Sequence, residues 1–173
     1  RIRIRAGTYR EGPINVDRSV ALIGEGFPVL DGEDQHPVLV VRADDVEIRG
    51  LRIRNTGVSH TRDNAAIRFE EVANCIVAGN RLENNFFGIY LAKSRHIEVV
   101  DNVVSGQAER EANSGNGIHL WNSESIRVER NTVQGHRDGI YIEFAEGSIF
   151  NENVAEHNLR YGLHFMFSDD SHY

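Results

Sequence analysis

The sequence predicts an all-β protein, a parallel β-helix that winds as a solenoid. Three observations support this prediction. Short apolar segments alternate with polar residues, an Asn recurs behind one set of segments, and a Gly recurs before another set. The two sets keep matching intervals along the chain. The commonest interval gives coils of about 22 residues, and a fixed period of about 20 to 50 residues is typical of repeat architectures.

Recurring Asn residues define the first set of segments. They follow the pattern Ile-x-Val-x-x-Asn-x-Val, or close variants of it, at Asn80, Asn102, Asn131 and Asn153. Their sequence numbers differ by 22, 29 and 22, and Leu51 takes the same place one coil before Asn80, again at a difference of 29. In a β-helix these residues would form a column at an inside corner, where each amide bonds the next and satisfies backbone groups of the bend. We therefore interpret the column as structural.

The second set of segments begins with Gly in four of its five members. The segments are residues 66–69, 88–91, 117–120, 139–142 and 162–165, and the sequence numbers of their Ile or Leu positions differ by 22, 29, 22 and 23. Alternation over a few residues, bounded by Gly, Asn, Asp and Ser, indicates strands and turns rather than helices. A leucine-rich repeat would share the Asn pattern, but the Leu that it places three residues earlier is missing in every coil.

Alternation in the second set also predicts which side chains face outward. If the Ile and Leu side chains point into the solenoid, their neighbours lie on the outer face of the same sheet. The outward pairs are Arg68 with Glu70, Tyr90 with Ala92, His119 with Trp121, Tyr141 with Glu143, and His164 with Met166. The two longer intervals place seven extra residues in each of two loops, residues 55–64 and 105–116, which we expect to flank this face.

The last outward pair, His164 and Met166, is a candidate metal site. Two residues apart in a strand, these side chains share a face with about 6.6 Å between their Cα atoms. Imidazole with thioether suits copper, above all Cu(I). A third ligand would come from His172, Tyr141, Glu143 or a partner protein, whereas His119, two coils away and about 10 Å along the stack, is too far to share the ion. The alternative is an exposed strand His beside a Met that only packs.

The remaining His and Cys residues have ordinary roles in this prediction. We expect the other histidines to lie solvated in turns or loops, at His36, His60, His96, His136 and His157. The single cysteine, Cys75, takes an inward apolar position and is expected in the core.

Composition narrows the class of protein. The chain of 173 residues carries 26 acidic and 19 basic side chains, a net charge of −7 that argues against a nucleic-acid partner. It contains no apolar run near the roughly 18 residues of a membrane-spanning helix. One domain, residues 1–173, accounts for the whole pattern. Because the chain opens inside a strand pattern and closes without a capping segment, we expect both ends to be cuts in a longer protein.

Residues 160–170, which read RYGLHFMFSDD, strongly resemble a segment of the NosD family. Residues 5–11, 24–26 and 30–32, which read RAGTYRE, GEG and LDG, are similar to the start of that family. The resemblance spans the chain. It implies a right-handed, pectin-lyase-like β-helix in the periplasm that helps to mature the copper centres of nitrous-oxide reductase. The partners implied are an ABC transporter and a copper chaperone lipoprotein.

Two further classes of function stay open. A carbohydrate-active enzyme, a polysaccharide lyase or uronan epimerase, could use the same solenoid, with Asp169 and Asp170 as paired carboxylates, although a turn is the simpler interpretation of that pair. A scaffold could bind a partner protein through the outer face. We expect a non-enzymatic copper-handling scaffold in which His164 and Met166 receive Cu(I). The expected partner-binding residues are Tyr90, His119, Trp121, Tyr141 and Glu143.

Overall fold

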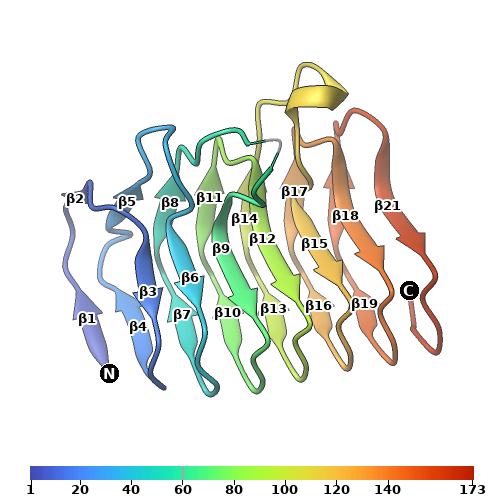
Figure 1. The fold of residues 1–173 in the computed structure, drawn as a ribbon, viewed down its shortest axis with the longest axis horizontal. Helices are drawn as coiled ribbons and strands as arrows, with labels where there is room; N and C mark the ends of the chain where they lie inside the picture. Colours follow the sequence, from blue (N-terminus) through green and yellow to red (C-terminus); the bar gives the residue numbers. More distant parts are fainter. Residues whose placement is uncertain (60) are drawn as a thin grey trace.

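The computed structural model describes residues 1–59 and 61–173. The chain forms three parallel sheets of seven strands each (Figure 1). The first sheet, sheet A, contains β1 (Ile2–Ile4), β4 (Ala21–Gly24), β7 (Glu47–Arg49), β10 (Ile76–Ala78), β13 (Glu98–Val100), β16 (Arg127–Glu129) and β19 (Ile149–Asn151). Sheet B contains β2 (Thr8–Tyr9), β5 (Val29–Asp31), β8 (Arg52–Arg54), β11 (Arg81–Glu83), β14 (Val103–Ser105), β17 (Thr132–Gln134) and β20 (Val154–Glu156). Sheet C contains β3 (Ile14–Val16), β6 (Leu39–Val41), β9 (Ala65–Glu70), β12 (Phe87–Ala92), β15 (Ile118–Trp121), β18 (Asp138–Glu143) and β21 (Tyr161–Met166).

Each coil of the solenoid contributes one strand to each sheet. Consecutive strands within a sheet therefore come from consecutive coils, and every strand pairing is parallel, as the predicted β-helix requires. The only helical segment among the described residues is a single 3-10 turn, η1 (Glu111–Asn113), in the loop between β14 and β15. The predicted fold class is confirmed.

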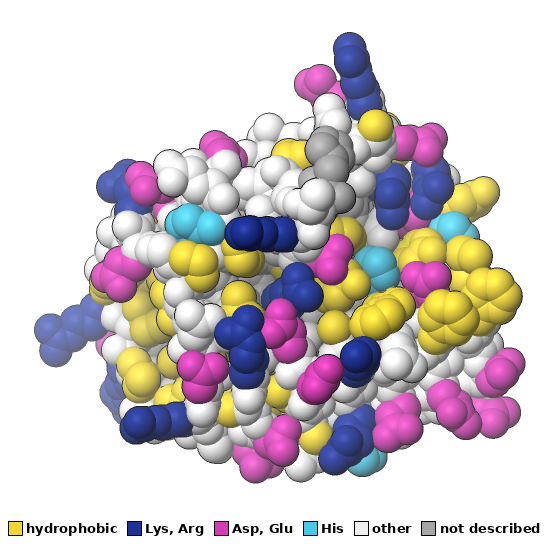
Figure 2. All heavy atoms as spheres, viewed as in Figure 1, with side chains coloured by type: hydrophobic (Ala, Val, Ile, Leu, Met, Phe, Trp, Pro, Cys, Tyr) yellow, Lys and Arg dark blue, Asp and Glu magenta, His cyan; other side chains and the backbone are white. Residues whose placement is uncertain are grey.

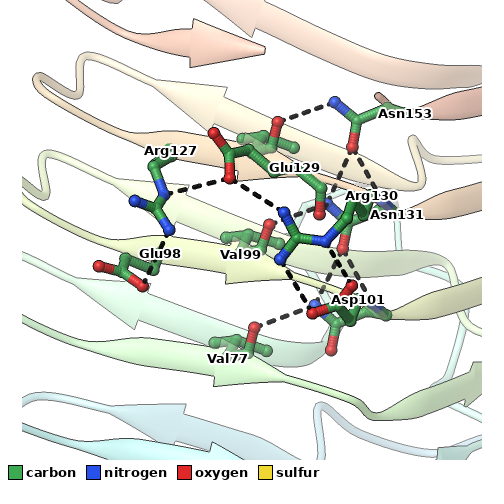
Figure 3. Close-up of polar contacts among 11 residues, drawn as sticks. Val77, Glu98, Val99, Asp101, Arg127, Glu129, Arg130, Asn131 and Asn153 are labelled. Carbon is green, nitrogen blue, oxygen red and sulfur yellow. Dashed lines mark hydrogen bonds and ion pairs between the residues drawn. The ribbon is translucent and has the colours of Figure 1, made fainter. Parts of the chain in front are cut away.

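The Asn column forms the predicted ladder between sheets A and B (Figure 3). The first three Asn each donate from Nδ2 to Oδ1 of the Asn one coil further on, at 3.0 Å from Asn80 to Asn102, from Asn102 to Asn131 and from Asn131 to Asn153. The same Oδ1 atoms also accept from the backbone N–H of the preceding Asn. Leu51 ends the ladder, and its backbone N–H donates to Asn80 Oδ1 at 3.0 Å.

The hydrophobic core fills the interior between the three sheets. Alternate residues of the strands point into it, and the largest fully buried side chains include Phe69, Ile89 and Leu120. The predicted interior position of Cys75 is confirmed, since its side chain is buried. Gly residues before sheet C strands are required by close packing. A Cβ on Gly117 would lie 2.7 Å from the carbonyl oxygen of Gly139 and closer still to Val133 Cγ1.

One prediction about the histidines is wrong. His136 is buried, with 2% of its surface exposed, because the ring packs against Gly106 and Gly117 rather than pointing into solvent. His96 and His157 are exposed as expected, and His36 is half-buried. His60 lies outside the described residues.

Candidate functional site

The outer face of sheet C carries the predicted row of side chains in register. Tyr90 pairs with His119, His119 with Tyr141, and Tyr141 with His164. Their ring centroids are 4.6, 4.8 and 4.8 Å apart along the stack. Figure 2 shows hydrophobic side chains gathered over the C-terminal part of this face, with charged groups toward its middle. The predicted row is confirmed, and it forms a continuous aromatic file across four coils.

Two members of this row are covered rather than open to solvent. Tyr90 is 6% and His119 is 8% exposed, because Phe87 packs against both rings and Phe86 and Trp121 close the cluster. Burial lowers the pKa of His119 to about 3, so the ring is neutral at physiological pH. Burial also raises the pKa of the Tyr90 hydroxyl. Both side chains pack inside this cluster, so they expose little surface to a partner.

The other three expected partner-binding residues are Trp121, Tyr141 and Glu143, and all are half-buried. Lys93 Nζ lies 5.7 Å from the ring centre of Trp121, so this ring has a cation beside it. Glu143 pairs in register with Met166. Tyr141 and Glu143 lie on the strand next to the candidate metal ligands and Trp121 lies one strand further on, and contact of all three with a partner stays a prediction.

His164 is oriented by a buried carboxylate that the sequence argument missed. Asp138, at the start of β18, is fully buried and accepts from Arg160 Nε at 3.0 Å and from Arg160 Nη2 at 2.5 Å. His164 Nδ1 lies 3.3 Å from Asp138 Oδ2. Although burial opposes ionisation, the hydrogen bonds from Arg160 and His164 outweigh it and lower the pKa of Asp138. An ionised Asp138 keeps the ring proton of neutral His164 on Nδ1. The lone pair of Nε2 is then available to bind a metal ion.

Met166 is held by the coil next to its own. Tyr141 Oη donates to Met166 Sδ at 3.2 Å, and the Tyr141 ring meets the His164 ring edge to face. One tyrosine therefore contacts both candidate ligands and keeps imidazole and thioether on the same patch. Tyr141 also brings a phenolic oxygen to the patch, as the sequence argument allowed.

His172 is excluded as the third ligand. It forms a bridge with Ile149 of β19, and its backbone carbonyl accepts from the N–H of Phe150, so it lies beside sheet A and not on the outer face of sheet C. Among residues 1–59 and 61–173, no group of three or more His, Cys, Asp or Glu side chains gathers closely enough to hold a metal ion. The candidate donors on the patch are the imidazole of His164, the soft thioether sulfur of Met166 and the phenolic oxygen of Tyr141, and Glu143 lies in register with Met166.

The N-terminal half of the same face has a different chemistry. Glu70 accepts from Arg42 Nε at 2.6 Å and contacts Arg68 Nε at 2.8 Å, so each carboxylate oxygen has a guanidinium partner. Two cavities of about 760 and 580 Å³ share Arg42, Arg68 and Glu70 in their linings. Arg42 was missed from the sequence because it follows β6, a strand that the two repeat sets do not include.

Fold and site together define a right-handed parallel β-helix that carries its candidate site on one outer wall. The chain belongs to the right-handed β-helix family, whose model, described as "Right handed beta helix region", matches residues 37–172. It is similar to two proteins named "Probable ABC transporter binding protein NosD". The protein from Pseudomonas aeruginosa (strain PAO1) is 34% identical over 138 residues, 79% of this chain and 32% of that protein. The protein from Stutzerimonas stutzeri is 32% identical over 141 residues, 80% of this chain and 32% of that protein.

These comparisons confirm the NosD resemblance that residues 160–170 indicated. The chain spans about a third of the length of the curated relatives that it matches. Within the part of the chain that the structure describes, no helix has the length and apolar character needed to cross a membrane.

Proposed function

We propose that this protein is a non-enzymatic, NosD-like binding module that works with an ABC transporter in the periplasm and passes on copper as Cu(I). Copper is the cargo in this proposal, not a resident cofactor. The observation that carries it is the patch formed by His164, Met166 and Tyr141, of which His164 and Met166 lie inside residues 160–170, the segment that resembles the NosD family.

The donor set of the patch suits Cu(I) in chemical type. Imidazole and thioether are soft enough to select Cu(I) over the hard divalent cations. Asp138 occupies Nδ1 of His164, so Nε2 is the ring nitrogen left to bind an ion, and Tyr141 holds the sulfur of Met166 on the same patch. Two protein donors leave the coordination of the ion incomplete, so a donor from a partner can join before the ion leaves. An incomplete site of this kind suits transfer better than storage.

The surroundings of the patch suit a protein partner. Trp121, Tyr141 and Glu143 are half-buried, and aromatic side chains are the anchors that interfaces favour. Both relatives carry a name that describes binding to an ABC transporter. The partners in this proposal are therefore ABC transporter subunits and a copper chaperone lipoprotein, and the process served is maturation of the copper centres of nitrous-oxide reductase.

Anaerobic titration with Cu(I) against a chromogenic chelator tests the site. The wild-type protein should compete for Cu(I), and the double variant His164→Ala, Met166→Ala should bind at least about tenfold more weakly, since it loses both soft donors. The matched control is His157→Asn, which removes an exposed imidazole and leaves a residue that tolerates the positive φ of 53° at this corner. Equal Cu(I) affinity in the wild type and the double variant would show that the ligands are misassigned.

The second candidate is a polysaccharide lyase or uronan epimerase. Its proposed carboxylates lie after β21, where Asp169 forms a bridge with Glu146 and Asp170 has a φ of 50° in a bend. This turn geometry favours a structural role for the pair. Incubation with polyuronates is the direct assay, because formation of unsaturated or epimerised products would favour the enzyme over the copper module.

A further inference from the structure

One corner of the solenoid carries two exposed aromatic rings beside the outer face of sheet C. This corner follows each sheet C strand, and after β18 and β21 it begins with Phe144 and Phe167. The two rings stack, with 5.2 Å between their centroids and 9° between their planes. Phe144 is 49% exposed and Phe167 is 70% exposed. Phe144 has a coil on each side of it, so the solvent reaches its ring from outside the solenoid.

The backbone at these two positions is unfavourable for Phe. The first residue of the corner has a positive φ, between 48° and 56°, in five successive coils, at Glu71, Lys93, Asn122, Phe144 and Phe167. Asn tolerates this conformation, whereas a bulky side chain rarely adopts it. Neither ring belongs to the hydrophobic core, so core packing does not account for Phe here. Backbone strain that the core does not require is typical of binding sites.

The side chains next to the two rings are acidic. The third residue of the corner is Glu124, Glu146 and Asp169 in the last three coils, paired in register, and Asp170 follows Asp169. All four carboxylates are exposed, and none forms an ion pair or a side-chain hydrogen bond with a residue that the structure describes. The corner contains no Lys or Arg in these three coils. Like charges in register repel one another, so a basic partner would relieve the repulsion.

The basic side chains of this corner belong to the fourth coil. Lys93 and Arg95 line a cavity of about 190 Å³ whose other walls include Phe144 and Glu146. Lys93 is already paired with Glu71 at 3.4 Å. The positive charge of the corner therefore ends before the two rings, and the carboxylates beside the rings lack a counter-charge. In Figure 2 acidic side chains gather along the lower edge toward the C-terminal end, the edge where Figure 1 shows the sheet C strands ending.

Another ring of the molecule shows how a Phe in this conformation is covered. Phe27 has a φ of 54° at a different corner, and the guanidinium carbon of Arg81 lies 4.1 Å from its ring centroid. A planar guanidinium stacks on an aromatic face and can pair with a carboxylate at the same time. Within the part of the chain that the structure describes, no Lys or Arg lies over Phe144 or Phe167. A guanidinium from another molecule fits that place.

We propose that this surface, which we call the corner patch, binds an arginine-containing segment of a partner protein. The corner patch consists of Phe144, Phe167, Glu124, Glu146, Asp169 and Asp170. Guanidinium groups of the partner stack on the rings and pair with the carboxylates, and apolar side chains between them pack on the ring edges. The carboxylates repel nucleic acid and anionic lipids, which leaves a basic polypeptide as the occupant. Phe167 follows Met166 directly, so the segment lies beside the copper patch, but the corner patch does not depend on the copper proposal.

Fluorescence anisotropy with a labelled peptide tests the two rings. The probe is a hexapeptide of alternating Arg and Leu, which the wild-type protein should bind. The double variant Phe144→Asn, Phe167→Asn should bind it about tenfold more weakly, since it loses both ring faces. Asn suits the positive φ, as Asn122 shows in the same column, so the fold should survive, and circular dichroism can verify this. The matched control is Phe27→Asn, which removes an exposed ring with the same backbone conformation and should leave the affinity unchanged.

Two further comparisons test the charge. The double variant Glu146→Gln, Asp169→Asn should weaken binding of the same peptide about tenfold at low salt. Its control, Glu152→Gln with Glu156→Gln, removes the same charge from exposed positions in and before β20 and should have a much smaller effect. A hexapeptide of alternating citrulline and Leu, which has the shape of the probe without its charge, should bind at least about tenfold more weakly to the wild type.

Several results would overturn the proposal. They are failure of the wild type to bind the peptide, equal affinity in the wild type and the Phe double variant, and equal effects of the two pairs of carboxylate substitutions. Flotation with phosphatidylcholine vesicles that depends on the two Phe residues would assign the rings to a membrane instead. A dimer in sedimentation that depends on them would assign the rings to a second copy of the chain. None of these results bears on Cu(I) binding, so the two proposals can fail separately.

Discussion

Two files of side chains run along the solenoid, one at an inside corner and one on the outer wall of sheet C. The inner file repeats a single residue, because each Asn must bond both the next Asn and the backbone of the bend. The outer file changes from coil to coil, from Arg68 through Tyr90 to His164. Burial and hydrogen bonding therefore fix the residue type in the inner file, whereas stacking in the outer file requires only that neighbours be compatible.

The largest expected effect comes from breaking the inner file. Asn102→Ala removes the donor to Val77 O and the acceptor for two N–H groups of Asn80. Because these partners are buried, we expect a loss of about 3–4 kcal/mol in the free energy of unfolding. Urea unfolding measures it, with Asn151→Ala as the exposed control. A loss as small as that of the control would mean that the ladder contributes little to stability.

A smaller effect should follow from Gly117→Ala, which tests the close approach of coils before sheet C. The new Cβ would clash with the carbonyl of Gly139, so we expect a loss of about 2–3 kcal/mol from overpacking. The matched control is Gly12→Ala, since nothing lies within 4 Å of a Cβ at that position. Thermal or urea unfolding of the two variants should separate clearly, and coinciding curves would contradict the packing argument.

On the outer face, Asp138→Asn should cost about 1–2 kcal/mol, because Arg160 and His164 lose their charged partner. The pKa of Asp138 is lower in the folded protein than the roughly 3.9 of an unfolded Asp. Its stabilising contribution is therefore present above about pH 4 and is lost as the pH falls through the folded value.

Two measurements check the Asp138 prediction. In urea unfolding, the stability difference between wild type and Asp138→Asn should narrow under acid conditions, and a constant difference would argue against an ionised Asp138. Nitrogen-15 NMR should find the proton of neutral His164 on Nδ1 in the wild type and a mixture of tautomers in the variant. An unchanged tautomer would show that Asp138 does not orient the ring.

The smallest effect is expected at the surface beside the inner file. Arg130 donates to both oxygens of Asp101 at 2.8 and 3.1 Å, but both side chains are exposed (Figure 3). Solvent screens such pairs. Arg130→Gln should leave the urea midpoint indistinguishable from that of the wild type. A clear shift would place the surface pairs, and not the Asn ladder alone, among the determinants of stability.

Most of the fold could be predicted because the solenoid repeats its own pattern. The repeat interval and the apolar alternation are together enough to predict the Asn ladder and the register of the outer row of sheet C. The first two coils are harder to predict from the sequence, because their sheet C strands, β3 and β6, do not belong to either repeat set. Arg42, next to β6, was missed for that reason.

The candidate site could be predicted only in part. Alternation assigns a side chain to the inner or outer face, but it does not say what covers that face, so the burial of His119 beneath Phe87 was not foreseen. His136 was assigned to solvent because its turn was expected to be open, whereas the neighbouring coils close over it. One feature of the sequence points to the role of Asp138. Arg160 follows one coil later, where an arginine can pair with this carboxylate.

Parallel pairing between neighbouring coils has a consequence for how such a protein can change over evolutionary time. Each strand bonds only to the strands directly before and after it in its sheet. Stability in solenoids is accordingly close to a sum of local contributions and nearest-neighbour interfaces. A loop can lengthen, or a new metal-binding side chain can arise on one coil, while the stability of distant coils remains unaffected. The proposed copper patch on sheet C could therefore have been acquired without any change in the coils at the other end of the scaffold.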